Sequence, residues 1–161
     1  MTHIFNILGK MIILGLGSNL GDRQRNLRAA IELIGAHLLS NIRESSIIST
    51  PAMMPEDAPP SWNIEFMNMA ISGELKVDIT PLEFLAEIKK IETALGRTES
   101  ERWAPRVIDI DILAWHDEIV DEPNLQIPHI GINGRDFVRL PLMELAPDWA
   151  NPRTGLRLAG E

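Results

Sequence analysis

The chain of 161 residues contains no cysteine, which excludes disulfides, thiolate metal sites and a cysteine nucleophile. It also lacks any run of about 18 apolar residues, so no transmembrane helix and no membrane partner are predicted. Residues 1–10 lack the basic start and the small-residue cleavage site of a secretory signal. We therefore treat them as an N-terminal extension and expect a cytoplasmic protein.

Positive charge is scarce. Lysine and arginine total 15 against 23 acidic residues, a formal net charge of −8. Such an acidic chain is not expected to bind nucleic acid broadly. Any phosphate ligand would have to be bound by local arginines, helix N-termini or bound cations.

The composition is that of an ordinary globular domain, with 45% apolar and 24% charged residues. The length is close to that of a common single domain and no internal repeat is present, so we expect one domain over residues 11–155. Hydrophobic periodicity and capping signals predict alternating strands and helices, in this order: strand 11–16, helix 22–38, strand 42–49, a loop at 50–61 with four prolines, strand 66–75, helix 80–95, strand 108–115, a hairpin at 117–126 and helix 139–145.

The β-α-β-β-α-β order predicts a ferredoxin-like α+β sandwich. Its sheet would be mainly antiparallel with helices on one face. The other face would be free for a ligand.

Asp109 and Asp111 alternate with three isoleucines in the predicted strand 108–115. Residues two apart in a strand point to the same face, roughly 7 Å apart. Two adjacent carboxylates repel unless a cation or water separates them. Oxygen ligands favour Mg²⁺ over Zn²⁺. The pair alone is equally compatible with the solvated outer face of an antiparallel sheet.

Arginines immediately precede this strand. Arg97, Arg102 and Arg106 lie within a polar segment that ends where the strand begins. Guanidinium groups match phosphate oxygens. Carboxylates that hold metal beside such a segment are what phosphoryl transfer requires. For one arginine alone, a surface salt bridge to Glu99 or Glu101 is the better interpretation, but for three beside two aspartates it is weaker.

A second group of residues is suited to a heterocyclic ligand. Asn68 lies in the middle of a predicted strand, where asparagine is disfavoured, and its amide could bind a ring edge. Phe66 and Phe137 could stack on an aromatic ring or belong to the core. Trp103 lies in a polar loop, which favours a ligand contact. His129 could donate to phosphate, although a lone histidine is more often structural.

Several of these segments together resemble one enzyme family. The segment 102–113 (RWAPRVIDIDIL) is similar to the signature of 6-hydroxymethyl-7,8-dihydropterin pyrophosphokinases. Further matches occur in the same order, namely 17–20 (GSNL), 66–68 (FMN) and 127–129 (IPH), followed by Arg135 and Phe137. The resemblance covers about Met11 to Arg153.

The resemblance implies a ferredoxin-like fold and a role in folate biosynthesis. The enzymes of this family transfer diphosphate from the co-substrate ATP to the pterin hydroxymethyl group and release AMP. It implies two Mg²⁺ ions held by Asp109 and Asp111, and catalytic roles for Arg97 and Arg106. The pterin would be bound by Thr50, Pro51, Phe66, Asn68, Trp103 and Phe137. ATP would be bound by Glu92, Arg102, Ile112, His129 and Arg135.

Two other functions remain open. One is a non-catalytic ferredoxin-like module that binds a metal or nucleotide, and the other is a nucleotide hydrolase. Release of AMP that depends on pterin would distinguish the pyrophosphokinase from both. The sequence ends soon after Arg153, which leaves open a bifunctional folate enzyme in which dihydropteroate synthase is fused to or follows this domain.

Overall fold

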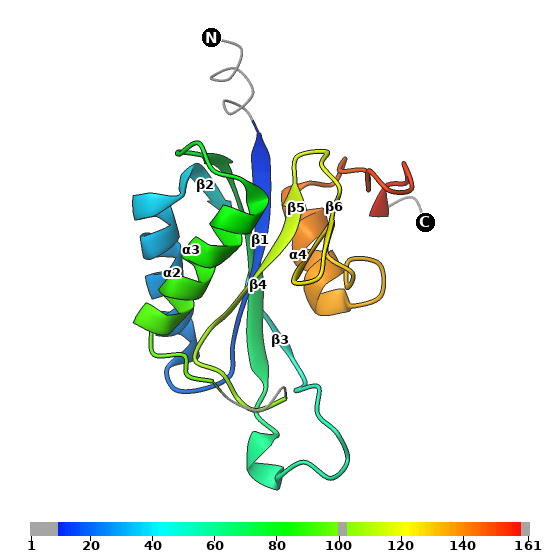
Figure 1. Cartoon of the computed structure of the whole chain (residues 1–161). Coiled ribbons are helices and arrows are strands. Elements are labelled where there is room, and N and C mark those ends of the chain that lie inside the picture. Colours follow the sequence, from blue (N-terminus) through cyan, green and yellow to red (C-terminus); the bar gives the residue numbers. More distant parts are fainter. Residues whose placement is uncertain (1–9, 100–102, 159–161) are drawn as a thin grey trace.

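The computed structural model describes residues 10–99 and 103–158 (Figure 1). Its centre is the strand β1 (Met11–Ser18), which lies between β4 (Phe66–Leu75) and β5 (Asp109–Trp115) in an antiparallel sheet. The strands β2 (Leu39–Glu44) and β3 (Ile48–Thr50) both pair with the outer edge of β4. The α+β class expected from the sequence is confirmed.

The register of the sheet brings three distant segments to one place. Gly17, near the end of β1, lies opposite Asn68 of β4 and opposite Asp109 of β5. Thr50 pairs with Phe66 at the start of β4. One end of the sheet therefore holds the candidate residues from four strands.

Two helices cover one face of the sheet. Helix α2 (Arg23–His37) begins after Asp22, whose side chain accepts a hydrogen bond from the Arg25 N–H. Helix α3 (Pro81–Ala94) begins with the predicted capping box between Thr80 and Glu83. The start of each helix therefore agrees with its capping signal.

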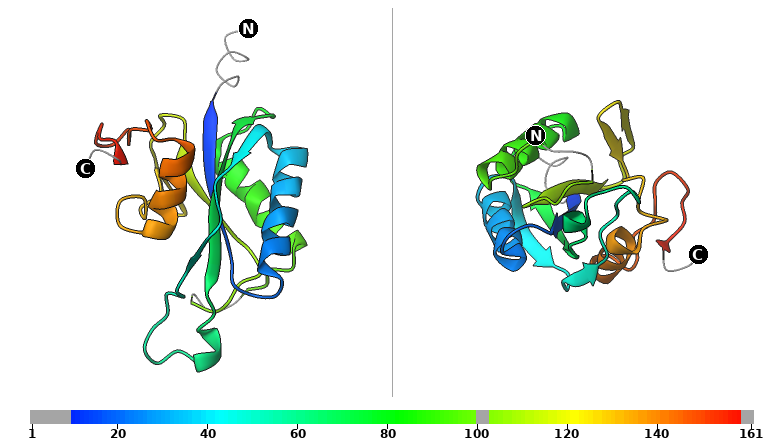
Figure 2. Two further views of the ribbon diagram at one scale, coloured as in Figure 1. Left: turned by 180° about the vertical axis from the view of Figure 1, so that it is seen from behind. Right: turned by 90° about the horizontal axis from the view of Figure 1, so that it is seen from below.

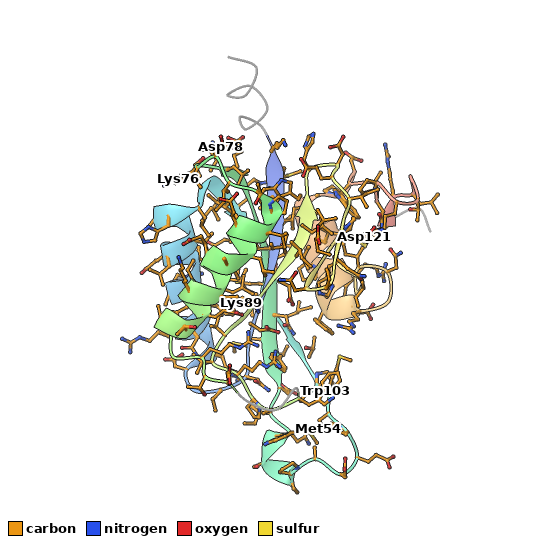
Figure 3. All side chains as sticks on the ribbon, viewed as in Figure 1. Met54, Lys76, Asp78, Lys89, Trp103 and Asp121 are labelled. Carbon is orange, nitrogen blue, oxygen red and sulfur yellow. The ribbon has the colours of Figure 1, made fainter. Side chains whose placement is uncertain are left out.

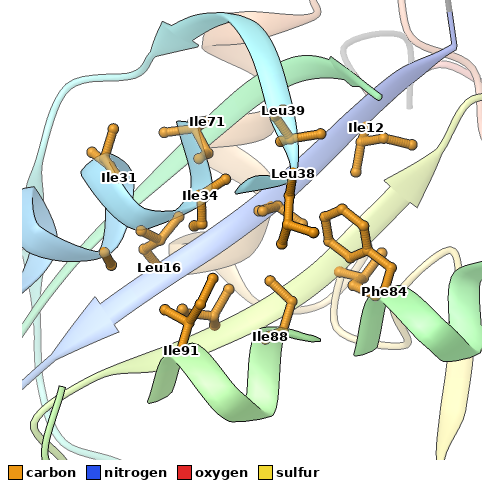
Figure 4. Close-up of a cluster of buried hydrophobic side chains, with 14 of the residues drawn as sticks. Ile12, Leu16, Ile31, Ile34, Leu38, Leu39, Ile71, Phe84, Ile88 and Ile91 are labelled. Carbon is orange, nitrogen blue, oxygen red and sulfur yellow. The ribbon is translucent and has the colours of Figure 1, made fainter. Parts of the chain in front are cut away.

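The main core lies between these helices and the sheet. Figure 4 shows aliphatic side chains from both layers interdigitating around Phe84. The ring of Phe84 packs edge-on against Trp115, with 5.2 Å between centroids. The labelled members of this core include Ile12, Leu16, Ile34, Ile71, Ile88 and Ile91.

The expectation of helices on one face only is wrong. Helix α4 (Asp136–Leu145), three residues longer than predicted, lies on the opposite face, as the views in Figure 2 show. The reason is that the central strands are apolar on both faces, so the second face also has to be buried. Its core consists of Ile13, Ala70, Leu113, Ala114, Ile132, Val138, Leu142, Leu145 and Leu158.

Smaller features differ from the predicted elements. The strand expected at 42–49 is divided, because Ser45 exchanges hydrogen bonds with Ala70 through its backbone N–H and its side-chain oxygen. The hairpin forms from β6 (Val120–Glu122) and β7 (Leu125–Ile127). The proline-rich loop contains one 3-10 turn, η1 (Pro60–Trp62). None of the described helices has the length and apolar character needed to cross a bilayer.

Candidate active site

A cavity of about 350 Å³ lies at the end of the sheet where the four strands meet. Segments distant in sequence form its wall, and most of the residues predicted from the sequence face it. Those lining the cavity are Thr50, Pro51, Phe66, Asn68, Arg97, Trp103, Arg106, Asp109, Asp111, His129, Arg135 and Phe137. Figure 3 shows Trp103 at the same end of the molecule as the proline-rich loop that carries Met54.

Asp109 and Asp111 project from β5 into this cavity, while the isoleucines between and beside them face the core. Their side chains are 30% and 44% exposed. Burial in the cavity wall, together with the negative charges of Asp109 and Glu92, raises the pKa of Asp111 to about 7. A divalent cation can reach the exposed part of Asp111 and would reverse this shift.

Arg97 and Arg106 both approach Asp109. Arg97 Nη1 donates to Asp109 Oδ1 at 3.0 Å and also to the carboxylate of Glu92. Arg106 Nη1 lies 3.6 Å from the same Asp109 oxygen. Two guanidinium groups thus lie beside a carboxylate pair, an arrangement suited to a phosphate ligand with a bound cation.

Glu92, predicted to contact ATP, lies behind the main cavity. Its side chain is 2% exposed and accepts hydrogen bonds from the Ile110 N–H at 2.9 Å and from Arg97. It therefore joins α3 to β5 and orients Arg97. Lys89, one turn earlier on the same helix, has Nζ 3.3 Å from Glu92 Oε1.

Two other residues predicted to contact ATP, Ile112 and Arg102, are not among the described side chains that line the cavity. The Ile112 side chain is buried in the main core at 3% exposure, so a ligand could meet only its backbone. Arg102 lies outside the described residues.

The opposite wall of the cavity is formed by Asn68 and Phe66. Asn68 is 8% exposed, and its Nδ2 donates to Thr50 Oγ1 at 2.6 Å. A Cβ atom on Gly17 would lie only 2.6 Å from Asn68 Oδ1 and 3.4 Å from Phe66. Glycine at position 17 therefore leaves room for the Asn68 amide. Phe137 reaches the same cavity from the first turn of α4.

His129 lies near the carboxylates in its neutral form. Burial lowers the pKa of His129 below its ordinary value, and the positive charge of Arg135 lowers it further. Its Nδ1 accepts a hydrogen bond from the Gly131 N–H at 2.9 Å, so the ring proton resides on Nε2. Nε2 lies 4.0 Å from Asp111 Oδ2 and is available to donate to a ligand.

Sequence reasoning assigned no role to Asn19, within the GSNL segment. The residue is 1% exposed. Asn19 Oδ1 accepts from the Arg106 N–H at 2.7 Å, and its own N–H donates to the Arg106 carbonyl at 3.1 Å. Its Nδ2 donates to the Ile64 carbonyl at 3.2 Å. The sequence signal that could have indicated this role is the position of a polar residue directly after an apolar strand.

Among the described residues, no group of three or more acidic or histidine side chains forms a preformed metal cage. Asp109 and Asp111 are the acidic side chains among the described residues that line the cavity. Mg²⁺ commonly takes one or two carboxylates and completes its coordination with substrate phosphates and water.

Comparison with known proteins identifies the family of the chain. The sequence profile of the 7,8-dihydro-6-hydroxymethylpterin-pyrophosphokinase family matches residues 13–147. A 2-amino-4-hydroxy-6-hydroxymethyldihydropteridine pyrophosphokinase from Methylorubrum extorquens is 39% identical over 136 residues, covering 84% of this chain and 82% of that protein. The enzyme of the same name from Bacillus subtilis is 37% identical over 139 residues, covering 86% and 79%.

Longer relatives also match. A folate synthesis bifunctional protein from Chlamydia trachomatis is 35% identical over 84% of this chain, which spans only 30% of that relative. The crystal structure of Plasmodium falciparum wild-type HPPK-DHPS has a TM-score of 0.69 at 17% identity, covering 92% of this chain and 40% of the other. That likeness concerns the fold. The chain belongs to the 7,8-dihydro-6-hydroxymethylpterin-pyrophosphokinase family.

Proposed function

We propose that this protein transfers diphosphate from ATP to 6-hydroxymethyl-7,8-dihydropterin in folate biosynthesis, with Mg²⁺ as the metal, and releases AMP. The observation that carries the proposal is that the aspartate pair, two arginines and the Asn68–Phe66 wall line one and the same cavity. Phosphate chemistry and heterocycle binding need these two groups of residues side by side.

The aspartate pair fits a divalent cation. Asp109 and Asp111 present only oxygen ligands. Burial, followed by nearby negative charge, raises the pKa of Asp111, and a bound cation would stabilise its ionised form. Bound there, Mg²⁺ would neutralise negative charge on the phosphate groups. We assign Asp109 and Asp111 as the residues that hold two such ions.

The reaction joins the pterin hydroxyl oxygen to the β-phosphorus of ATP and breaks the bond between that phosphorus and the oxygen bridging to the α-phosphate. The hydroxyl proton is lost, and AMP leaves with the bridging oxygen. Arg97 and Arg106 stabilise the negative charge that develops on the phosphoryl oxygens. Neutral His129, with its proton on Nε2, donates a hydrogen bond to a phosphate of ATP. Arg135 binds the phosphate groups of the same ATP molecule.

The pterin is assigned to the opposite wall of the cavity. Asn68 lies where its amide can pair with the polar edge of the ring, and Thr50 holds the orientation of that amide. Phe66 and Phe137 contact the two faces of the ring, while Pro51 and Trp103 close its sides. Contacts with aromatic and apolar side chains exclude water, which strengthens each polar interaction in the pocket.

We further infer a ferredoxin-like arrangement, supported by the strand order β2-β4-β1-β5 with a helix after β1 and another after β4. A cytoplasmic location and a single domain over residues 11–155 remain predictions. Fusion to dihydropteroate synthase is likewise a prediction, motivated by the bifunctional relatives.

The decisive test is AMP release measured with purified protein, ATP, Mg²⁺ and 6-hydroxymethyl-7,8-dihydropterin. We expect AMP and the pterin diphosphate in equal amounts, and little AMP when either the pterin or Mg²⁺ is left out. AMP formed at the same rate without pterin would identify a nucleotide hydrolase. Binding of ATP without any turnover would indicate a non-catalytic module.

A further inference from the structure

An arginine near the C-terminus holds the hairpin that leads to His129. Arg153 lies in the segment after α4, and its Nη1 and Nη2 both donate to the carboxylate of Asp121 on β6. Its Nη2 also donates to the Val120 carbonyl at 3.2 Å and to the Ile127 carbonyl at 3.0 Å. Val120 and Ile127 lie opposite one another in the register of β6 and β7. One side chain therefore bonds both strands of the hairpin, on which Figure 3 labels Asp121.

We propose that Arg153 is a positioning residue for His129: by bonding the Ile127 carbonyl, it sets the direction in which the chain enters the cavity. This inference rests on the proposed function, in which His129 donates to a phosphate of ATP. His129 is among the described residues that line the cavity, whereas Arg153 is not. Arg153 therefore acts through the segment that it holds and not by touching a substrate.

A short stretch of backbone connects the arginine contact to the imidazole. His129 lies two residues beyond Ile127, and Pro128 between them has no N–H to donate. The buried side chain of Ile127 fixes its position in the core but not the rotation of its peptide group. The bond from Arg153 fixes that carbonyl before Pro128, and the His129 N–H donates to the Leu113 carbonyl at 3.0 Å after it. Without Arg153 the first constraint is lost, and the orientation of the imidazole is less defined.

The hairpin is small, and Arg153 is itself anchored. The strands β6 and β7 have three residues each and form a two-stranded sheet of their own. Such a sheet is marginal without tertiary contacts. The Arg153 N–H donates to Asn151 Oδ1 at 2.9 Å, and Asn151 is 6% exposed. The guanidinium thus starts from a fixed backbone, and its planar fork matches a carboxylate.

The alternative is an ordinary ion pair on the surface. Arg157 provides that comparison, because its Nη1 lies 3.6 Å from Asp148 Oδ1 and both side chains are mostly exposed. Such pairs contribute little to stability. Arg153 differs because it also bonds two backbone carbonyls. Arg157→Ala is therefore a matched control, which removes the same charge from the same segment of the chain.

The experiment is calorimetric titration with ATP and Mg²⁺, and separately with 6-hydroxymethyl-7,8-dihydropterin. The proteins are the wild type, Arg153→Ala, Arg157→Ala, His129→Ala and the double variant of Arg153 and His129. We expect the Kd for ATP to rise roughly tenfold in His129→Ala, the scale of one hydrogen bond to a charged group. In Arg153→Ala it should rise roughly threefold, because the same contact is weakened and not removed.

The double variant tests the route of the effect. It should bind ATP like His129→Ala, because two residues that act through one contact are not additive. The Kd for pterin should be unchanged in Arg153→Ala, and Arg157→Ala should bind both ligands like the wild type. Asp121→Ala removes the carboxylate that holds the guanidinium and leaves Arg153 in place. It should weaken ATP binding in the same direction, and it carries the test if Arg153→Ala does not fold.

Three results would overturn the inference. Unchanged ATP affinity in Arg153→Ala and in Asp121→Ala would exclude a positioning role. Equal losses for ATP and pterin would indicate a general structural role. A loss in the double variant equal to the product of the two single losses would mean that Arg153 does not act through His129. If the wild type releases AMP in a pterin-dependent way, these results leave the proposed function standing; a wild type that binds no ATP overturns both.

Discussion

At the residue scale, the aspartate pair illustrates how two neighbours in one strand can have different surroundings. Asp109 accepts from Arg97 and lies beside Arg106. Asp111 lies 4.0 Å from a histidine that is neutral, and its pKa is raised by burial and by nearby negative charge. The negative charge of Asp109 is therefore compensated by arginines within the protein, whereas that of Asp111 would gain more from a bound cation.

Asp111→Asn should lower the rate of pterin-dependent AMP release by roughly 100-fold or more, because a metal ligand supplies several kcal/mol of charge stabilisation. Its thermal stability without metal should be equal to or above that of the wild type, since a repelled negative charge is removed. The matched control is Asp117→Asn, whose carboxylate is 82% exposed beside His116. Near-normal turnover of Asp111→Asn at saturating Mg²⁺ would contradict the metal assignment.

Asn68→Ala should weaken pterin binding selectively. The variant leaves the polar edge of the ring without its partner, at about 1–3 kcal/mol, or roughly 5- to 150-fold in affinity. The Kd for ATP should barely change, and both constants can be measured by calorimetry. Thr50→Val removes only the contact that orients the amide, so it should have a smaller effect in the same direction. Equal losses for pterin and ATP would mean that Asn68 is structural.

At the scale of elements, Asn19 holds three segments of backbone together. Its side chain and N–H bond the Arg106 backbone, which precedes β5, and its amide nitrogen donates to Ile64, which precedes β4. Both segments carry residues of the proposed site. The end of β1 thus fixes Arg106 relative to the wall that contains Phe66.

Asn19→Ala should lower the free energy of unfolding by about 1–3 kcal/mol, because the partly buried Arg106 N–H loses its acceptor. It should also lower kcat, since Arg106 loses its fixed position. Chemical denaturation and steady-state kinetics test the two effects. Arg23→Ala is the control: it removes an exposed hydrogen bond to the Glu65 carbonyl in the same segment without touching Arg106. Equal changes in both variants would argue against a specific role for Asn19.

At the scale of the whole molecule, the enclosed carboxylate should couple folding to pH. The pKa of Asp111 is 3.8 ordinarily and about 7 in the folded chain. Between these values the folded state binds more protons than the unfolded state, so stability falls as pH rises. The contribution is unfavourable when Asp111 is ionised, and it levels off above about pH 7.

The difference in free energy of unfolding between Asp111→Asn and the metal-free wild type should therefore grow from about pH 4 to pH 7. Urea denaturation in the presence of EDTA, repeated across that pH range, measures this difference. The other titrating groups are the same in both proteins, so their contributions cancel. Adding Mg²⁺ should reduce the difference if the cation binds as proposed. A difference that does not vary with pH would mean that Asp111 is not strained by its surroundings.

Much of the fold was predictable because its signals are local. Asp22 and Thr80 cap their helices through contacts three residues away. The alternation around Asp109 places both aspartates on the ligand face, since successive side chains in a strand point to opposite faces. The prediction that the second face of the sheet carries no helix was wrong. The sequence around Ile13, Ala70 and Leu113 does not indicate which element packs on these residues, and in the structure it is α4.

By itself, the sequence determined the order of strands and helices and most of the polar residues that line the cavity, because periodicity and capping act over a few residues. Only the tertiary structure decided which of those residues share one cavity. The antiparallel register sets Gly17 between Asn68 and Asp109. Long-range contacts place Glu92 behind Arg97, Asn19 beneath Arg106 and Lys89 at the cavity wall. Such contacts depend on how distant segments pack together, and no local pattern along the chain encodes them.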